Sequence, residues 1–355
     1  MLIMGFGLIA LYSASNNNVR VGMDIFYDQM IGTMFGLGGM LILSQLSYRK
    51  FFDFAYIFYG FSVLLLIFVL TIGHQALGAT RWFAIGGVRF QPSEISKLAV
   101  IFMLARYFSQ RRPRLSFDVH STMHGLWGDL LAPLFLVGIS IGLIFKQPDL
   151  GTAILVGGIF VIMLYVSGIR QWIFGWFIGI CMALMPFAWH ILKPYQKDRL
   201  MVFLNPNIDP LGAGYTIIQS KIAVGSGGIF GKGWLSGTQS QLNFLPERHT
   251  DFIFSVIGEE WGLMGGVFLL YCYSMIIYCA FKIAEYNKDK FGHMVAIGIA
   301  GILSLQVVIN IGMVLGLCPV VGITLPLMSY GRTSYLIFVI MLGFLLNLSK
   351  KRTVF

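Results

Sequence analysis

Charged residues are scarce in this sequence. They make up 11% of its 355 residues, whereas hydrophobic residues make up 57% and the mean hydropathy is +0.79. An ordinary soluble domain contains about 25% charged residues, because its surface must stay hydrated. The deficit excludes a soluble globular protein, a disordered chain and a coiled coil. It predicts an all-α polytopic membrane protein, since a bilayer supplies the apolar solvent that this composition needs.

Cysteine is also scarce, and the histidines form no zinc motif. The four cysteines are Cys181, Cys272, Cys279 and Cys318. They lie within or at the ends of apolar runs and lack metal-ligand spacing, so we expect packed or lipid-facing thiols. The six histidines form no His-Glu-x-x-His sequence. The sequence therefore predicts neither a disulfide scaffold nor a zinc site.

Long apolar runs recur along the whole chain. Runs of about 20 residues can cross a hydrocarbon core of about 30 Å, and they predict about ten transmembrane helices in a single integral membrane domain, residues 1–355. The expected spans are Met1 to Ser15, Met30 to Leu46, Phe51 to Ile72, Pro92 to Ser109, Leu130 to Phe145, Gly151 to Val166, Trp172 to Leu192, Asp251 to Phe281, Met294 to Leu317 and Gly331 to Leu348. The first run, about 22 Å long as a helix, predicts a partial helix or an upstream start. No basic segment precedes it, so no signal peptide is expected.

Basic residues are distributed unevenly between the segments that connect these spans. With the N-terminus in the cytoplasm, the inner segments hold Arg49, Lys50, Arg111, Arg112, Arg114, Arg170, Lys282, Lys288, Lys290, Lys350, Lys351 and Arg352, and the short outer segments hold only Arg20, Arg81, Arg89 and Lys146. This asymmetry follows the positive-inside rule and predicts cytoplasmic N- and C-termini. It accounts for most of the net charge of +10, so we expect no nucleic-acid partner. Residues 193–250 then form one large extracytoplasmic loop.

Four expected spans begin with polar residues on the outer side. These beginnings are Gln91-Pro92-Ser93-Glu94, Gln147-Pro148-Asp149-Leu150-Gly151-Thr152, Asp251 and Ser329-Tyr330-Gly331. A helix N-terminus carries partial positive charge, so several such ends around one pocket would bind an anion. Each motif alone is also typical of an ordinary helix start. Glu94 and Lys97 are three residues apart and can pair on one helix face, either as a structural ion pair or within a site.

Asp251 is the acid best placed at the outer mouth of a helix bundle. On one continuous helix, Glu259 would lie about 80° and Glu260 about 180° around the axis from Asp251, and both would lie deeper. We therefore expect the two glutamates to form pairs or hydrogen bonds between helices.

The glycine-rich run 225–233 has the look of a phosphate-binding loop. It is not a Walker A sequence, because Ser226 occupies the first glycine position and Gly233 occupies the position of Ser or Thr. We expect a flexible loop that approaches the membrane.

Six motifs are spread along the chain. They are Arg81-Trp82-Phe83, Gln91-Pro92-Ser93-Glu94, Gln147-Pro148-Asp149-Leu150-Gly151-Thr152, Gly237-Thr238-Gln239-Ser240-Gln241, the run from Leu245 to Phe254, and Pro326-Leu327-Met328-Ser329-Tyr330-Gly331. Together they resemble the SEDS family of bacterial cell-shape and division proteins over nearly the whole chain. The fourth motif is similar to the elongation (RodA) branch rather than the division (FtsW) branch. After the last motif, Arg332 stands where the family usually has glycine, and it either distorts the turn or adds a phosphate contact.

The resemblance implies a peptidoglycan glycosyltransferase that polymerises lipid II at the outer face of the bacterial cytoplasmic (inner) membrane during cell elongation. It implies a class B penicillin-binding protein as partner, with membrane lipid and undecaprenyl-pyrophosphate-linked glycan as ligands. The family's essential acid maps onto Asp251. As general base, this carboxylate would take the proton of the acceptor 4-hydroxyl while that oxygen attacks the donor's anomeric carbon.

The leaving pyrophosphate of that reaction needs positive charge. The candidate cations are Arg81, Lys97, Arg199, Lys221 and Arg248, and a divalent cation such as Mg²⁺ or Mn²⁺ is the other source. The resemblance adds Trp82, Glu94, Asp149 and Ser329 to the expected substrate-binding residues.

Two other functions remain open at this point. A transporter or flippase for a lipid-linked precursor would also have many helices and intramembrane charges, but its polar groups would lie near the midplane. A non-catalytic scaffold that activates a synthase would need no acid at the mouth of a groove. The polar groups on one face favour the transferase.

Overall fold

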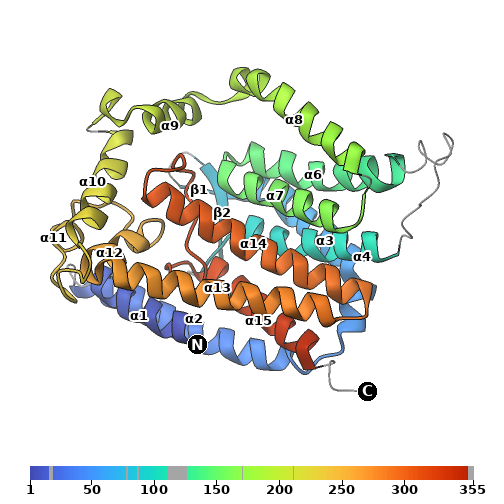
Figure 1. Ribbon diagram of the computed structural model, residues 1–355, viewed down its shortest axis with the longest axis horizontal. Coiled ribbons are helices and arrows are strands. Elements are labelled where there is room, and N and C mark those ends of the chain that lie inside the picture. Colours follow the sequence, from blue (N-terminus) through green and yellow to red (C-terminus); the bar gives the residue numbers. More distant parts are fainter. Residues whose placement is uncertain are drawn as a thin grey trace. The chain divides into compact units, whose positions relative to one another are not determined.

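The computed structural model describes residues 1–15, 19–76, 79–85, 88–110, 126–169, 171–210 and 212–350, and most of them lie in helices (Figure 1). Internal contacts divide the chain into two compact units. The first unit is Met1–Gly38, Phe187–Ile277 and Ser304–Val339, and the second is Gly39–Pro186, Tyr278–Leu303 and Ile340–Phe355. The single-domain organisation of residues 1–355 stays a prediction.

The helices and strands follow the apolar runs of the sequence. The first unit contains α1 (Leu2–Ser15), α9 (Pro194–Leu204), the 3-10 turn η2 (Pro206–Ile208), α10 (Ala213–Ser226), α11 (Thr238–Gln241) and α12 (Ile253–Glu260). The second unit contains α3 (Tyr48–Ile72), β1 (His74–Ala76), β2 (Ala79–Ile85), β3 (Val88–Phe90), α4 (Pro92–Ser109), the π-helical turn η1 (Leu126–Leu131), α6 (Ala132–Lys146) and α7 (Leu150–Val166). Both units include parts of α2 (Val19–Leu43), α8 (Gln171–Ile191), α13 (Gly262–Tyr286), α14 (Lys290–Val314) and α15 (Arg332–Lys350).

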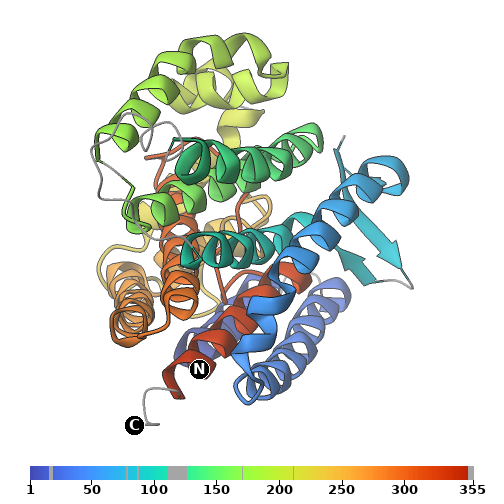
Figure 2. The same ribbon diagram turned by 90° about the vertical axis from the view of Figure 1, so that its right-hand side faces the viewer.

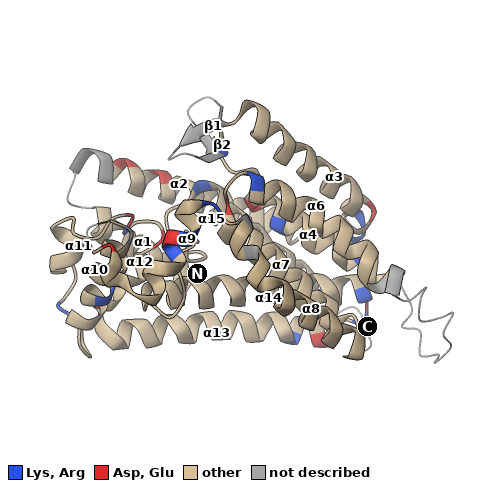
Figure 3. Cartoon of the chain, turned by 90° about the horizontal axis from the view of Figure 1, so that it is seen from above, with Lys and Arg blue, Asp and Glu red and all other residues tan. Residues whose placement is uncertain are grey.

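A helix occupies each expected span, which confirms a polytopic helical membrane protein. Within the described residues, five helical segments are long and apolar enough to cross a membrane: Met23–Leu43, α3, α13, α14 and α15. Shorter apolar helices are α1, α6, α7 and Gln171–Phe187 of α8. Figure 3 shows the charged residues of α13 and α14 gathered toward helix ends. In α4, Glu94 lies in the first turn and Arg106 in the last turn, and Lys97 lies about one turn after Glu94.

The expected span from Asp251 to Phe281 is wrong as one continuous helix. It is divided into α12 and α13 at Gly262, whose φ is +64°. A Cβ at Gly262 would lie 2.4 Å from the backbone nitrogen of Gly231, so the break depends on a close approach of a second segment. α12 has eight residues, about 12 Å of helix, and is too short to cross a membrane.

The second unit is built around α4. Most of this helix is buried, and it packs against α3, α6 and α7. Phe102 of α4 lies against Phe344 at a ring-centroid distance of 4.8 Å. A small antiparallel sheet, order β1-β2-β3, adjoins α3 and was not expected from an all-α pattern (Figure 2).

The first unit contains the long segment 193–250, which is largely helical. α10 packs against α12, and α12 packs against α1 (Figure 1). Phe6 of α1 meets Trp261 at a centroid distance of 5.2 Å. The extracytoplasmic position of residues 193–250 stays a prediction.

Candidate active site

Asp251 lies two residues before α12 in the first unit and is half-buried. Its backbone carbonyl accepts a hydrogen bond of 2.9 Å from the Nδ2 of Asn310, on α14. The same Nδ2 donates to the carbonyl of Ile323 at 2.6 Å. Asn310 therefore joins the backbone of Asp251 to the loop that follows α14, residues 315–331.

Arg199 of α9 contacts this loop close to Asp251. Its Nη1 donates to the carbonyl of Val320 at 3.1 Å. A methyl group built on Gly322 would lie 3.5 Å from the Oδ2 of Asp251 and 4.0 Å from the Nη1 of Arg199. The carboxylate and the guanidinium thus both border the small space above Gly322, whose φ of +72° suits glycine.

Lys221 of α10 lies over the start of the loop. A methyl group on Gly316 would be 2.5 Å from the Lys221 Nζ, so the ammonium crosses directly above that glycine. The neighbouring Ser220 fixes this position, because its Oγ donates to the carbonyl of Val314 at 2.7 Å and lies 2.9 Å from the Ser255 Oγ of α12. Lys221 is exposed and makes no hydrogen bond or ion pair with the described residues. The structure therefore brings Asp251, Arg199 and Lys221 to one loop.

Buried side chains hold this loop in place. Gln306 of α14 donates to the carbonyl of Thr324 at 2.8 Å, and Tyr273 of α13 donates to the carbonyl of Pro326. The Ser329 Oγ accepts from the backbone N–H of Leu325 at 2.8 Å and is 3% exposed. Ser329 thus has an internal role, and its contact with substrate stays a prediction. Sequence reasoning missed Asn310 and Gln306, although an amide side chain inside an apolar run is itself a signal of function.

Arg248 holds the segment before Asp251. Its Nε donates to the carbonyl of Ala14 at 2.6 Å, and its Nη1 donates to the Oδ1 of Asn243. Burial lowers the pKa of the Arg248 guanidinium. Arg248 thus joins the segment before Asp251 to the end of α1. A role for Arg248 in substrate binding stays a prediction.

Asp149 joins two expected helix starts in the second unit. It caps α7, where its carboxylate accepts from the Thr152 backbone N–H at 3.2 Å and from the Thr152 Oγ1 at 2.9 Å. It also accepts from the Gln91 Nε2 at 3.1 Å and the Ser93 Oγ at 3.2 Å, both next to the start of α4. Two motifs that were noted separately are therefore one buried hydrogen-bond cluster.

The other expected site residues of the second unit lie near these helix starts. Arg81 of β2 donates its Nε to the Gln147 carbonyl at 3.0 Å and its Nη2 to the Pro148 carbonyl. Glu94 and Lys97 form an ion pair of 2.7 Å in which the Lys97 side chain is fully buried. Trp82 lies in β2 and is half-buried. Substrate binding by these residues stays a prediction.

Arg332, the departure from the family pattern, has a partner within the first unit. Its Nη2 pairs with the Oδ2 of Asp28 on α2, and the Tyr330 hydroxyl lies 3.4 Å from the same oxygen. The residue begins α15 without a positive φ at Gly331. A salt bridge, rather than a distorted turn, accommodates the arginine.

The Glu259 side chain is fully buried and accepts hydrogen bonds from the motif at residues 237–241. Its Oε1 lies 2.9 Å from the Lys232 Nζ and accepts from the Gln239 N–H at 2.9 Å, while its Oε2 accepts from the Ser240 N–H at 3.1 Å. Burial alone would raise the Glu259 pKa, but the hydrogen bonds from Gln239, Lys232 and Ser240 outweigh it and hold the pKa below its ordinary value. The motif at residues 237–241 is therefore held in place by a buried carboxylate.

The glycine-rich run packs against α12 and α13 through its backbone. The N–H groups of Lys232 and Gly233 donate to the carbonyls of Glu259 and Glu260, each at 3.0 Å. A Cβ on Gly227 would lie 1.9 Å from the Gly258 carbonyl oxygen. The glycines thus allow two backbones to touch, and these amides are not available to a phosphate.

The raised pKa of Glu260 should make the stability of the protein depend on pH. Burial raises its pKa to about 7, opposed by a hydrogen bond from Ser13. The unfolded chain ionises this group above its ordinary pKa of 4.5, while the folded chain resists ionisation until about 7. Stability should therefore fall as pH rises between these values. We expect Glu260→Gln to remove this decrease in the thermal unfolding midpoint in detergent between pH 5 and pH 8. The same slope in wild type and variant would contradict this assignment.

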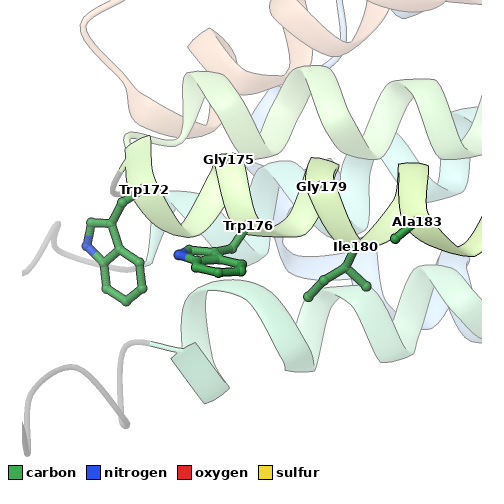
Figure 4. A pocket seen from close by; sticks show the side chains of 6 residues that line it. All are labelled: Trp172, Gly175, Trp176, Gly179, Ile180 and Ala183. Carbon is green, nitrogen blue, oxygen red and sulfur yellow. The ribbon is translucent and has the colours of Figure 1, made fainter.

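The part of the chain that the structure describes contains no group of three or more His, Cys, Asp or Glu side chains placed to hold a metal ion. A groove of about 570 Å³ lies along α8 in the second unit and is lined by Trp172, Gly175, Trp176, Gly179, Ile180 and Ala183 (Figure 4). Its lining carries no charged group, so it suits an apolar chain rather than a pyrophosphate.

These features define a class of protein: a polytopic helical membrane protein in which a carboxylate and two cations lie against one loop. The family model described as Cell cycle protein, of the FtsW, RodA and SpoVE proteins, matches residues 1–354. The chain belongs to this family.

Three similar proteins cover almost all of the chain. The Escherichia coli K12 protein named peptidoglycan glycosyltransferase MrdB is 40% identical over 356 residues, which are 99% of this chain and 92% of that protein. A chain of a peptidoglycan synthase complex, solved to describe how polymerization and crosslinking are coordinated, matches with a TM-score of 0.81 and 35% identity, covering 100% of this chain and 96% of that one. The Thermus thermophilus rod shape determining protein RodA matches with a TM-score of 0.72 and 31% identity, covering 99% and 94%.

Proposed function

We propose that the chain is a peptidoglycan glycosyltransferase of the elongation type that polymerises lipid II. One observation carries the proposal: Asp251 and Arg199 border the same space at Gly322, and Lys221 lies over the same loop at Gly316. An acid next to two cations suits a reaction in which a hydroxyl loses its proton and a pyrophosphate leaves. Membership of a family that includes MrdB supports the assignment.

Asp251 acts as the general base in the proposed mechanism. The 4-hydroxyl oxygen of the acceptor sugar attacks the anomeric carbon of the donor, and its proton passes to the Asp251 carboxylate. The bond from the anomeric carbon to the phosphate oxygen breaks, so the electron pair and negative charge leave with undecaprenyl pyrophosphate. Attack from the face opposite the leaving group inverts the α-linked donor to a β-1,4 glycan. One base is sufficient, because pyrophosphate needs stabilisation of charge rather than a second carboxylic acid.

Arg199 and Lys221 stabilise the leaving pyrophosphate. Both side chains are exposed and lie against the loop 315–331, and an arginine can bind a phosphate through two parallel hydrogen bonds. Arg81, Trp82, Glu94, Lys97, Asp149, Arg248 and Ser329 complete the proposed substrate-binding set. A divalent cation such as Mg²⁺ or Mn²⁺ would add charge at the pyrophosphate when bound.

The enzyme works in the bacterial cytoplasmic membrane with its active site on the outer side. The excess of Lys and Arg in the expected inner segments supports cytoplasmic N- and C-termini. The apolar groove on α8 suits a polyprenyl or acyl chain. A class B penicillin-binding protein is the proposed partner, supported by the match to a chain of a peptidoglycan synthase complex.

Purified protein and lipid II provide the test of this function. We expect the chain, reconstituted with its cognate class B penicillin-binding protein, to form long glycan strands that persist in moenomycin, which blocks contaminating synthases. Gel separation of labelled products gives the measurement. Lipid II that stays monomeric with a folded complex would contradict the function and favour the scaffold. Movement of lipid II across a vesicle bilayer without polymer would favour the transporter.

A further inference from the structure

Asn310 of α14 is buried directly behind Asp251. The residue is fully buried, and its side-chain amide makes two donations from one nitrogen, to the Asp251 carbonyl and to the Ile323 carbonyl. Its Oδ1 accepts no hydrogen bond from the described residues. The hydrogen bonds of this side chain are therefore the two that join the backbone of Asp251 to the loop 315–331.

The position of the acid depends on this joint. Asp251 precedes α12, whose first residue is Ile253, and so it lies outside the regular hydrogen bonds of that helix. Ile323 directly follows Gly322, the residue that the Asp251 carboxylate and the Arg199 guanidinium both border. Arg199 is held to the same loop at Val320. One amide nitrogen thus joins the segment that carries the base to the loop to which Arg199 is hydrogen-bonded.

The geometry points to Asn310 as a positioning residue for catalysis, which sets the location of the Asp251 carboxylate without touching the substrate. This inference rests on the proposed function. A displacement of a reacting group by about 1 Å can cost about 100-fold in rate, so loss of the joint acts on the chemical step. Substrate affinity should change less than the rate, because the Asn310 side chain bonds neither cation: Arg199 donates to the Val320 carbonyl, and the Ser220 hydrogen bonds hold α10.

Gln306 provides a matched control on the same helix. It is 1% exposed, lies one helical turn before Asn310, and donates to the Thr324 carbonyl at 2.8 Å. A leucine at either position removes an amide that holds the same loop, but only Asn310 also holds Asp251. A difference between the two variants therefore isolates the link to the acid.

The test compares kcat and KM for lipid II in wild type, Asn310→Leu, Asn310→Ser and Gln306→Leu, each in complex with the partner synthase. We expect Asn310→Leu to lower kcat by about 10- to 100-fold with KM changed less than about twofold. Asn310→Ser keeps one donor and should lose less, and it provides the test if the leucine variant fails to fold. Gln306→Leu should lower kcat by less than about fivefold.

Three results would overturn the inference. They are wild-type kcat in folded Asn310→Leu and Asn310→Ser, equal losses in the Asn310 and Gln306 variants, and a rise in KM that accounts for the whole effect. A wild-type enzyme that forms no polymer would instead contradict the proposed function. An active Asp251→Asn variant would contradict the role of the base, so the failures are distinguishable.

Discussion

Asp251→Asn should abolish glycan polymerisation while leaving the fold intact. The amide keeps the size of the carboxylate but cannot accept the proton of the attacking hydroxyl, and loss of a general base lowers rates by about 10²- to 10⁴-fold. The fold should survive, because the contacts of Asp251 with Asn310 use its backbone carbonyl. The measurement is polymer formed from labelled lipid II per complex, with the thermal unfolding midpoint as the check on folding.

Asp198→Asn is the matched control for this experiment. Asp198 is an exposed acid of α9 next to Arg199, and its substitution removes the same charge from the same part of the protein. We expect near wild-type polymerisation. Asp251→Glu should also be poor, because one added methylene moves the base by more than about 1 Å. Polymerisation by folded Asp251→Asn at the wild-type rate would show that another group takes the proton.

The sequence predicts the helices well because each span is a local property. An apolar run of sufficient length crosses a bilayer whatever its neighbours are, and every expected span contains a helix. The division of the eighth span is not a local property. Gly262 breaks it where the backbone of Gly231, about 30 residues earlier, approaches within contact distance, and no pattern in residues 251–281 records that approach.

The chemistry of the site was easier to predict than its assembly. The sequence predicts Asp251 as the base and offers five candidate cations without ranking them, but only the fold shows that Asp251, Arg199 and Lys221 all lie against residues 315–331. Asp149 and Arg248 were also expected to bind substrate, yet their polar atoms hold helix starts and loops together. Spacing cannot separate the two cases, because a buried polar group must find a partner whether or not a substrate binds.

Glu259→Ala should destabilise the protein by about 1–3 kcal/mol, the cost typical of leaving buried hydrogen-bond donors without an acceptor. The Glu259 side chain is fully buried, and its loss would leave the N–H groups of Gln239 and Ser240 without their acceptor, while the Lys232 ammonium would keep the Thr238 hydroxyl. Each abandoned donor retains its desolvation cost. Residues 232–241 should therefore loosen, and the thermal unfolding midpoint in detergent should fall, with a smaller fall for Glu259→Gln.

Glu285→Ala is the control for Glu259→Ala, because Glu285 pairs with Lys282 at 2.8 Å on an exposed surface. Exposed pairs contribute little, so no measurable change in midpoint is expected. The effect of pH has the opposite sign to that of Glu260. Since the folded pKa of Glu259 lies below its ordinary value, its stabilisation is present near neutral pH and is lost as pH falls through the folded pKa. Wild type and Glu259→Ala should thus converge in acid. A gap between their midpoints that stays constant down to the acid limit would mean that packing, rather than the carboxylate's charge, holds the motif at 237–241 in place.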